Sequence, residues 1–99
     1  MIRGTTPTHH FNLPFEASMI SAVRAIYKQG TKEVLRKETP DFRLEGQRVS
    51  VDLTQEETFL FDCRTPVKLQ LRVKTIRGQV LNTRTMVVSV AECLDSEVL

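Results

Sequence analysis

The sequence predicts an all-β fold: a seven-stranded antiparallel β-sandwich, Ig-like in general arrangement, with one short helix between the fifth and sixth strands. Three observations support this prediction. Apolar and polar residues alternate in short runs along most of the chain, glycine or proline residues separate many of these runs, and only one clear helix start signal occurs. A small β-barrel is the alternative that the same pattern allows.

The first three predicted strands lie in residues 8–13, 21–29 and 32–38, after an extended lead-in over residues 1–7. Pro14 closes the first strand, and we expect Phe15 to fill the core just after it. Residues 16–20 are expected to form one helical turn. In the second strand the inward residues are Val23, Ala25 and Tyr27. The third strand is polar, which suits the edge of a sheet.

The fourth and fifth predicted strands, residues 42–44 and 48–53, form a tight hairpin around a turn that contains Gly46. We expect Leu44 to pair with Val49. Thr54 and Glu57 then have the spacing of a capping box, which predicts a helix over residues 55–60. The apolar residues that we expect to pack onto the sandwich from this helix are Phe59, Leu60 and Phe61.

The strongest strand signal is the unbroken alternation from Val67 to Lys74, followed by a turn at Gly78 and a returning strand over residues 80–90. The predicted core residues of this hairpin are Val67, Leu69, Leu71 and Val73, with Met86, Val88 and Val90 on one face of the returning strand. The residues expected to face water are Lys68, Gln70, Arg72 and Lys74.

The register of this hairpin contains a conflict. A two-residue loop of Arg77 and Gly78 would pair Ile76 with Gln79, and it would place Leu71 beside Arg84. The same register gives the favourable pairs Leu69 with Met86 and Val67 with Val88. A bulge over residues 82–84 would remove the conflict, and so would an Arg84 side chain that packs its stem and extends its head into water. Both solutions remain open.

Length and composition predict a single globular domain over residues 1–99, with 40% hydrophobic and 26% charged residues and a net charge of +2. No apolar run approaches a membrane span, and no secretion signal is expected at the start. The two cysteines, Cys63 and Cys93, are expected to be reduced, with a disulfide as the alternative.

The sequence predicts no catalytic, cofactor-binding or metal-binding residues, and we expect a protein that is not an enzyme and uses no cofactor. His9 and His10 are neighbours in a strand, so they point to opposite faces and are poorly placed to share a metal ion. Glu56 and Glu57 follow Thr54 and are interpreted as helix-capping carboxylates. No nucleophile motif or phosphate-binding loop occurs.

A basic stripe is the strongest candidate for a binding surface. Its members are Lys68, Arg72 and Lys74, with Arg77 and Arg84 as possible additions. Nucleic-acid binding would use such a stripe, but stacking modules also place aromatic residues on that face, and this face has none. The sequence therefore disfavours nucleic acid as a partner, and a solvated face is the alternative interpretation. Residues 5–7 and 95–99 either add to a neighbour's sheet edge or fray.

Several segments resemble short prophage proteins of Gram-positive bacteria. The opening Met1-Ile2-Arg3-Gly4-Thr5-Thr6-Pro7-Thr8, followed by Phe11-x-Leu13-Pro14-Phe15, is similar to the start of that group, and so are Leu53-Thr54-Gln55-Glu56-Glu57-Thr58, Val67-x-Leu69-Gln70-Leu71-Arg72-Val73 and Glu97-Val98-Leu99. Size and strand pattern are distantly similar to the N-terminal β-sandwich of upper baseplate proteins. Cys63, Cys93 and the richer basic stripe depart from the group's pattern.

The resemblance implies a phage structural or accessory protein of the tail or baseplate. We therefore expect a non-enzymatic assembly module that acts through protein–protein contacts, with other phage structural proteins as partners and a homo-oligomer as a further possibility. Its expected location is the bacterial host cytoplasm during assembly and then the virion, with no membrane association. The alternative function is a carbohydrate- or host-surface-binding β-sandwich module.

Overall fold

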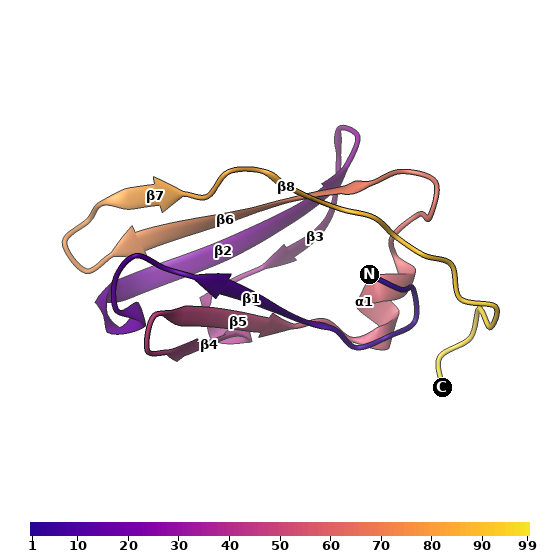
Figure 1. The fold of residues 1–99 in the computed structure, drawn as a ribbon, viewed down its shortest axis with the longest axis horizontal. Coiled ribbons are helices and arrows are strands. Elements are labelled where there is room, and N and C mark those ends of the chain that lie inside the picture. Colours follow the sequence, from indigo (N-terminus) through magenta and orange to yellow (C-terminus); the bar gives the residue numbers. More distant parts are fainter.

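The computed structural model describes all of residues 1–99 and contains eight strands in two antiparallel sheets. The three-stranded sheet has the order β1 (Thr8–Asn12), β5 (Arg48–Asp52) and β4 (Phe42–Glu45). The five-stranded sheet has the order β3 (Lys32–Lys37), β2 (Ile20–Gln29), β6 (Val67–Thr75) and β7 (Val80–Asn82), and β8 (Met86–Val88) also pairs with β6. Figure 1 shows the two sheets as two layers.

The all-β prediction is therefore confirmed, but the count of seven strands is wrong. The returning strand expected over residues 80–90 is two short strands, β7 and β8. The order of strands also differs from that of immunoglobulin domains, whose first two strands are neighbours, because here β1 pairs with β5 while β2 pairs with β3 and β6. This chain and the immunoglobulin domains share only the general arrangement of two packed antiparallel sheets.

The interruption between β7 and β8 solves the register conflict of the hairpin. The Thr75 N–H donates to the Gln79 carbonyl oxygen (2.8 Å), so the loop has three residues, with Gly78 at a φ of 86°. The predicted pairing of Ile76 with Gln79 is thus wrong by one residue. One extra residue in the break then restores the register, and the predicted pairs Leu69 with Met86 and Val67 with Val88 are confirmed.

Thr83 sits in this break and takes the place that Arg84 would have had opposite Leu71. Its backbone N–H donates to the carbonyl oxygen of Leu71 (2.9 Å), and its hydroxyl accepts from the Leu71 N–H (3.0 Å). The Thr83 hydroxyl therefore takes the place of a backbone carbonyl oxygen as the acceptor for the Leu71 N–H. Arg84 is left exposed and outside both strands.

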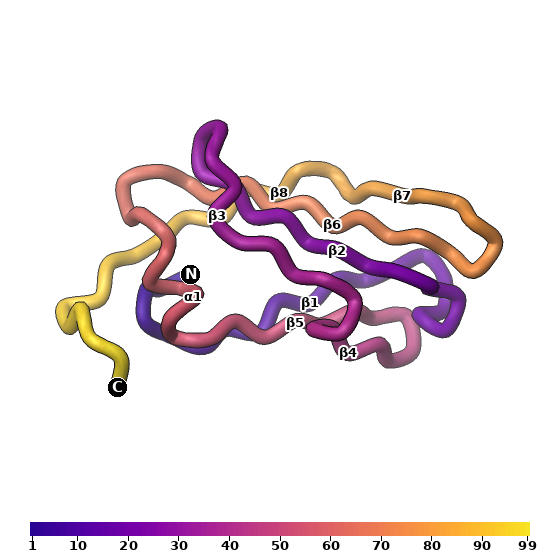
Figure 2. The backbone as a smooth tube through the Cα atoms, turned by 180° about the vertical axis from the view of Figure 1, so that it is seen from behind, coloured from indigo at the N-terminus to yellow at the C-terminus, as the bar shows by residue number.

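Short helical turns occur at all three places where the chain crosses from one sheet to the other. The 3₁₀ turn Ala17–Met19 joins β1 to β2, and the 3₁₀ turn Thr39–Asp41 joins β3 to β4. Helix α1 (Gln55–Phe59) joins β5 to β6 and has the predicted capping box, in which Thr54 accepts from the Glu57 N–H (3.2 Å) and Glu57 accepts from the Thr54 N–H (2.8 Å). Figure 2 shows α1 at the same end of the sandwich as residues 92–99.

The core lies between the sheets and is built from the alternating residues of each strand. From β2 it contains Val23, Ala25 and Tyr27, and from β6 it contains Val67, Leu69, Leu71 and Val73, as predicted. Val49, Val51 and Phe11 enter from the three-stranded sheet. Phe61 after α1 is buried, whereas the prediction for Leu60 is wrong: this side chain is 59% exposed because it caps the five-residue helix on its outer side.

The segment at residues 1–5 is held by the rest of the chain. Ile2 forms a parallel bridge with Ala91, and the Arg3 N–H donates to the Ala91 carbonyl oxygen (3.0 Å). Gly4 adopts a φ of 78°, and the ring of Phe59 lies where a Cβ at this position would stand. The sequence predicts an extended lead-in over residues 1–7. In the structure the first five of these residues pack against α1 and residues 89–91.

Candidate functional site

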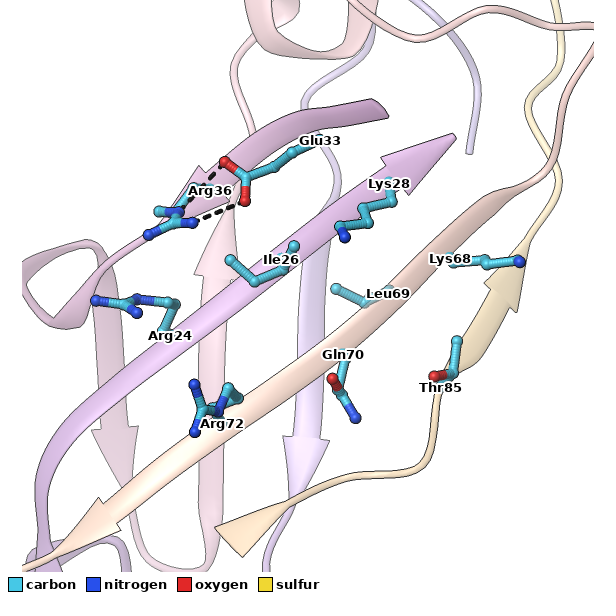
Figure 3. Close-up of a pocket in the computed structure, with 10 residues that line it drawn as sticks. All are labelled: Arg24, Ile26, Lys28, Glu33, Arg36, Lys68, Leu69, Gln70, Arg72 and Thr85. Carbon is cyan, nitrogen blue, oxygen red and sulfur yellow. Dashed lines mark hydrogen bonds and ion pairs between the residues drawn. The ribbon is translucent and has the colours of Figure 1, made fainter. Parts of the chain in front are cut away.

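The outward side of the five-stranded sheet carries six of the fourteen basic residues of the chain. We define the basic face by its six basic residues, Arg24, Lys28, Arg36, Lys68, Arg72 and Lys74, which line two adjoining depressions of about 400 and about 200 Å³. Figure 3 shows that the first five of these side chains surround the larger depression, with Ile26 and Gln70 near its centre.

The alternation of β2 and β6 places these residues on one face, and the antiparallel register then brings like charges together. Arg24 lies directly opposite Arg72, and Lys28 lies directly opposite Lys68. Directly opposite residues have Cβ atoms about 4.5–5.5 Å apart, and like charges at that spacing destabilise a sheet. Two such pairs on neighbouring strands therefore oppose folding.

Only part of this positive charge is neutralised within the sheet. Arg24 pairs with Glu38 (Nε to Oε1, 2.9 Å), and Arg36 pairs with Glu33 (2.8 Å). The hydrogen bond from Arg36 lowers the pKa of Glu33 and keeps this carboxylate charged. The other four basic residues of the face form no ion pair, although Arg72 donates to the Asn82 side chain (3.0 Å).

The charge of the molecule is thus unevenly distributed. With six basic residues and the two acidic residues Glu33 and Glu38, the face has a formal charge of +4. The remaining eight basic and ten acidic residues of the chain carry −2, which gives the net charge of +2. The small net charge of the whole chain conceals a strongly positive face.

The structure keeps part of the predicted basic stripe and adds residues from other strands. Lys68, Arg72 and Lys74 belong to the face, whereas Arg77 lies in the β6–β7 turn and Arg84 lies in the break between β7 and β8. Sequence reasoning missed Arg24, Lys28 and Arg36 as members. Their outward positions follow from alternation, but nothing in the sequence states that β2 is the neighbour of β6.

The two histidines have separate partners, as their predicted opposite directions imply. His9 is half-buried with its Nδ1 2.7 Å from the Tyr27 hydroxyl, and the exposed His10 has its Nδ1 2.8 Å from the Ser50 hydroxyl. Burial lowers the pKa of His9 and raises the pKa of Tyr27. No cluster of three or more histidine, cysteine or acidic residues lies close enough together to hold a metal ion.

Glu57 has a structural role in addition to capping α1. Its carboxylate pairs with the buried Lys37 of β3 at 2.7 Å and so joins the helix to the edge of the five-stranded sheet. Burial raises the pKa of Glu57, but the hydrogen bonds from Lys37 and the Thr54 backbone outweigh it and leave the pKa lowered. Cys63 and Cys93 are both free thiols.

The comparisons with known proteins give no family for this chain. No protein-family model and no curated protein matches it. In addition, the structure contains no helix that is both long and apolar enough to cross a membrane.

Proposed function

We propose that the chain is a non-enzymatic phage structural protein, a tail or baseplate assembly module that acts through contacts with other proteins. The resemblance to short prophage proteins supports the setting. The exposed edge of the five-stranded sheet supports the mode of action, and it is the observation that carries the proposal.

One part of this edge is β7, which pairs only with β6, and the other part is β8. The proposal concerns β7. All three residues of β7 are exposed, and with the preceding turn this strand presents Ile76 (63% exposed), Val80 (53%) and Leu81 (44%) to solvent. An unpaired strand edge offers backbone donors and acceptors to a partner strand, and apolar side chains beside it add buried area when a partner binds.

The expected setting follows from this mode of action. Partners are other phage structural proteins, with assembly in the host cytoplasm and a final position in the virion. A rigid sandwich suits this work because its edges keep their geometry while they bind.

The test is co-purification with the proteins encoded beside the chain, using the variant Ile76→Asp/Val80→Asp and the control Leu60→Asp. Leu60 is equally exposed, at 59%, but lies at the end of α1. We expect the wild type and the control to retain a partner and the edge variant to lose it. Retention by all three proteins would exclude the β7 edge, and failure of the wild type with every component would contradict the assembly function.

The positions of the aromatic residues do not favour the carbohydrate-binding alternative. Sugar-binding surfaces use exposed aromatic rings, and here Tyr27, Phe11, Phe42 and Phe61 are buried while Phe15 and Phe59 are partly buried. Tyr27 is 1% exposed and has its hydroxyl bonded to His9.

A further inference from the structure

The basic face is not explained by the β7 edge, and it works against folding. The like-charge neighbours Arg24 and Arg72, and Lys28 and Lys68, repel each other across β2 and β6. A bound group that carries negative charge would remove this repulsion. The face is therefore expected to bind a ligand with several carboxylate or phosphate groups.

The shape and chemistry of the face favour an acidic protein segment over a nucleic acid. Single-stranded nucleic acids need aromatic platforms for their bases, and the residues that line the two depressions include none. Ile26 lies between the two like-charge pairs and gives the larger depression an apolar floor beside Gln70. A segment that combines carboxylates with aliphatic side chains matches both features.

The chain itself contains a segment of this kind at residues 92–99. It carries three acidic residues, Glu92, Asp95 and Glu97, and no basic ones. Its aliphatic residues are unusually exposed for their type, with Leu94 and Leu99 fully exposed and Val98 50% exposed. Its anchor to the sandwich is slight: Gln55 of α1 exchanges two hydrogen bonds with the backbone of Leu99 (2.7 and 3.4 Å).

We propose that the basic face binds residues 92–99 of a second copy of this chain; this inference rests on the proposed assembly function and names one partner for it. In Figures 1 and 2 residues 92–99 extend beyond the end of the sandwich at which α1 lies, away from the outward side of β2 and β6. The contact thus joins two different surfaces, so copies associate either by exchanging segments in a closed dimer or head to tail in a ring or an open chain.

The extended length of the acidic segment is similar to the distance between the two like-charge pairs of the basic face. The two like-charge pairs are four residues apart along the strands, which is roughly 13 Å at the usual rise of a strand. An extended segment from Glu92 to Glu97 spans about 17 Å by the same rise. Eight residues bury less area than a stable interface requires, so the association is weak, depends on concentration and falls with salt.

The test is the solution mass of the full chain, measured by light scattering over a range of concentrations at about 20 mM and about 500 mM salt. The face variant is Lys68→Glu/Arg72→Glu, which lowers the charge of the face from +4 to zero. The segment variant is Asp95→Asn/Glu97→Gln. The control is Lys32→Glu/Arg48→Glu, which makes the same charge change at two exposed residues outside the face and outside the β7 edge.

We expect the mass of the wild type and the control to rise with concentration at low salt, and the face and segment variants to associate at least about tenfold more weakly. Wild-type mass for the face variant, or a loss of association in the control as well, would overturn the inference. So would a wild type that stays monomeric while it retards a DNA duplex through the face. A monomeric wild type that still retains a phage protein through β7 would overturn this inference alone and leave the assembly function standing.

Discussion

The two sides of the β2–β6 strand pair carry different kinds of cross-strand pairs, apolar on the inward side and like-charged on the outward side. On the inward side the register joins Val23 with Val73, Ala25 with Leu71, and Tyr27 with Leu69, and all six residues are buried. On the outward side the same register joins Arg24 with Arg72 and Lys28 with Lys68. Cross-strand apolar pairs stabilise a sheet, and like-charge pairs destabilise it. The inward side therefore accounts for the fold, while the outward side points to binding.

The largest expected change in the free energy of unfolding comes from a substitution on the inward side. Leu71→Ala removes a fully buried side chain from the centre of β6, and the free energy of unfolding should fall by about 2–5 kcal/mol. The matched change on the outward side is Lys74→Ala, which alters an exposed residue of the same strand and should change the free energy by less than about 0.5 kcal/mol. Urea unfolding of both variants measures the difference. Equal losses would contradict the division of roles between the two sides.

A smaller effect concerns the one polar contact at the margin of the inward side, between His9 and Tyr27. Burial, the amino terminus of Met1 and the charge of His10 all lower the pKa of His9 below its value in the unfolded chain. The unfolded chain therefore binds a proton first as the pH falls, and the protein should lose stability from about pH 7 towards about pH 5. The pKa values of Asp52 and Glu57 are lowered as well, but their contributions disappear only at more acidic pH.

The measurement for this prediction is the free energy of unfolding against pH. His9→Gln should flatten the curve between about pH 7 and about pH 5. An unaltered slope in the His9 variant would exclude the buried imidazole as the source.

The sequence predicts the strands better than the site, for a physical reason. Alternation reports which side of a strand a residue occupies, so the inward residues of β2 and β6 and the stripe of Lys68, Arg72 and Lys74 are correct. It does not report which strands are neighbours, so the pairing of Arg24 with Arg72 is not visible before folding. The break at Thr83 was one of two open solutions, because a bulge and a packed Arg84 stem satisfy the same pattern.

An apolar residue is also not always buried where the end of a helix sets the direction of its side chain. Leu60 is exposed although Phe61 beside it is buried, since the end of a five-residue helix decides which of the two turns inward. The contact of residues 1–3 with residues 89–91 joins distant parts of the chain, and no short-range pattern in the sequence predicts it.

The most direct test of the central claim is to measure stability and solution mass in one variant, Lys68→Glu. This change turns the like-charge pair with Lys28 into an opposite-charge pair, so the free energy of unfolding should rise by about 0.2–1 kcal/mol. The same change should weaken self-association at low salt. A variant that is more stable and less associated is the predicted result; a loss of stability, or association at the wild-type level, would contradict the account.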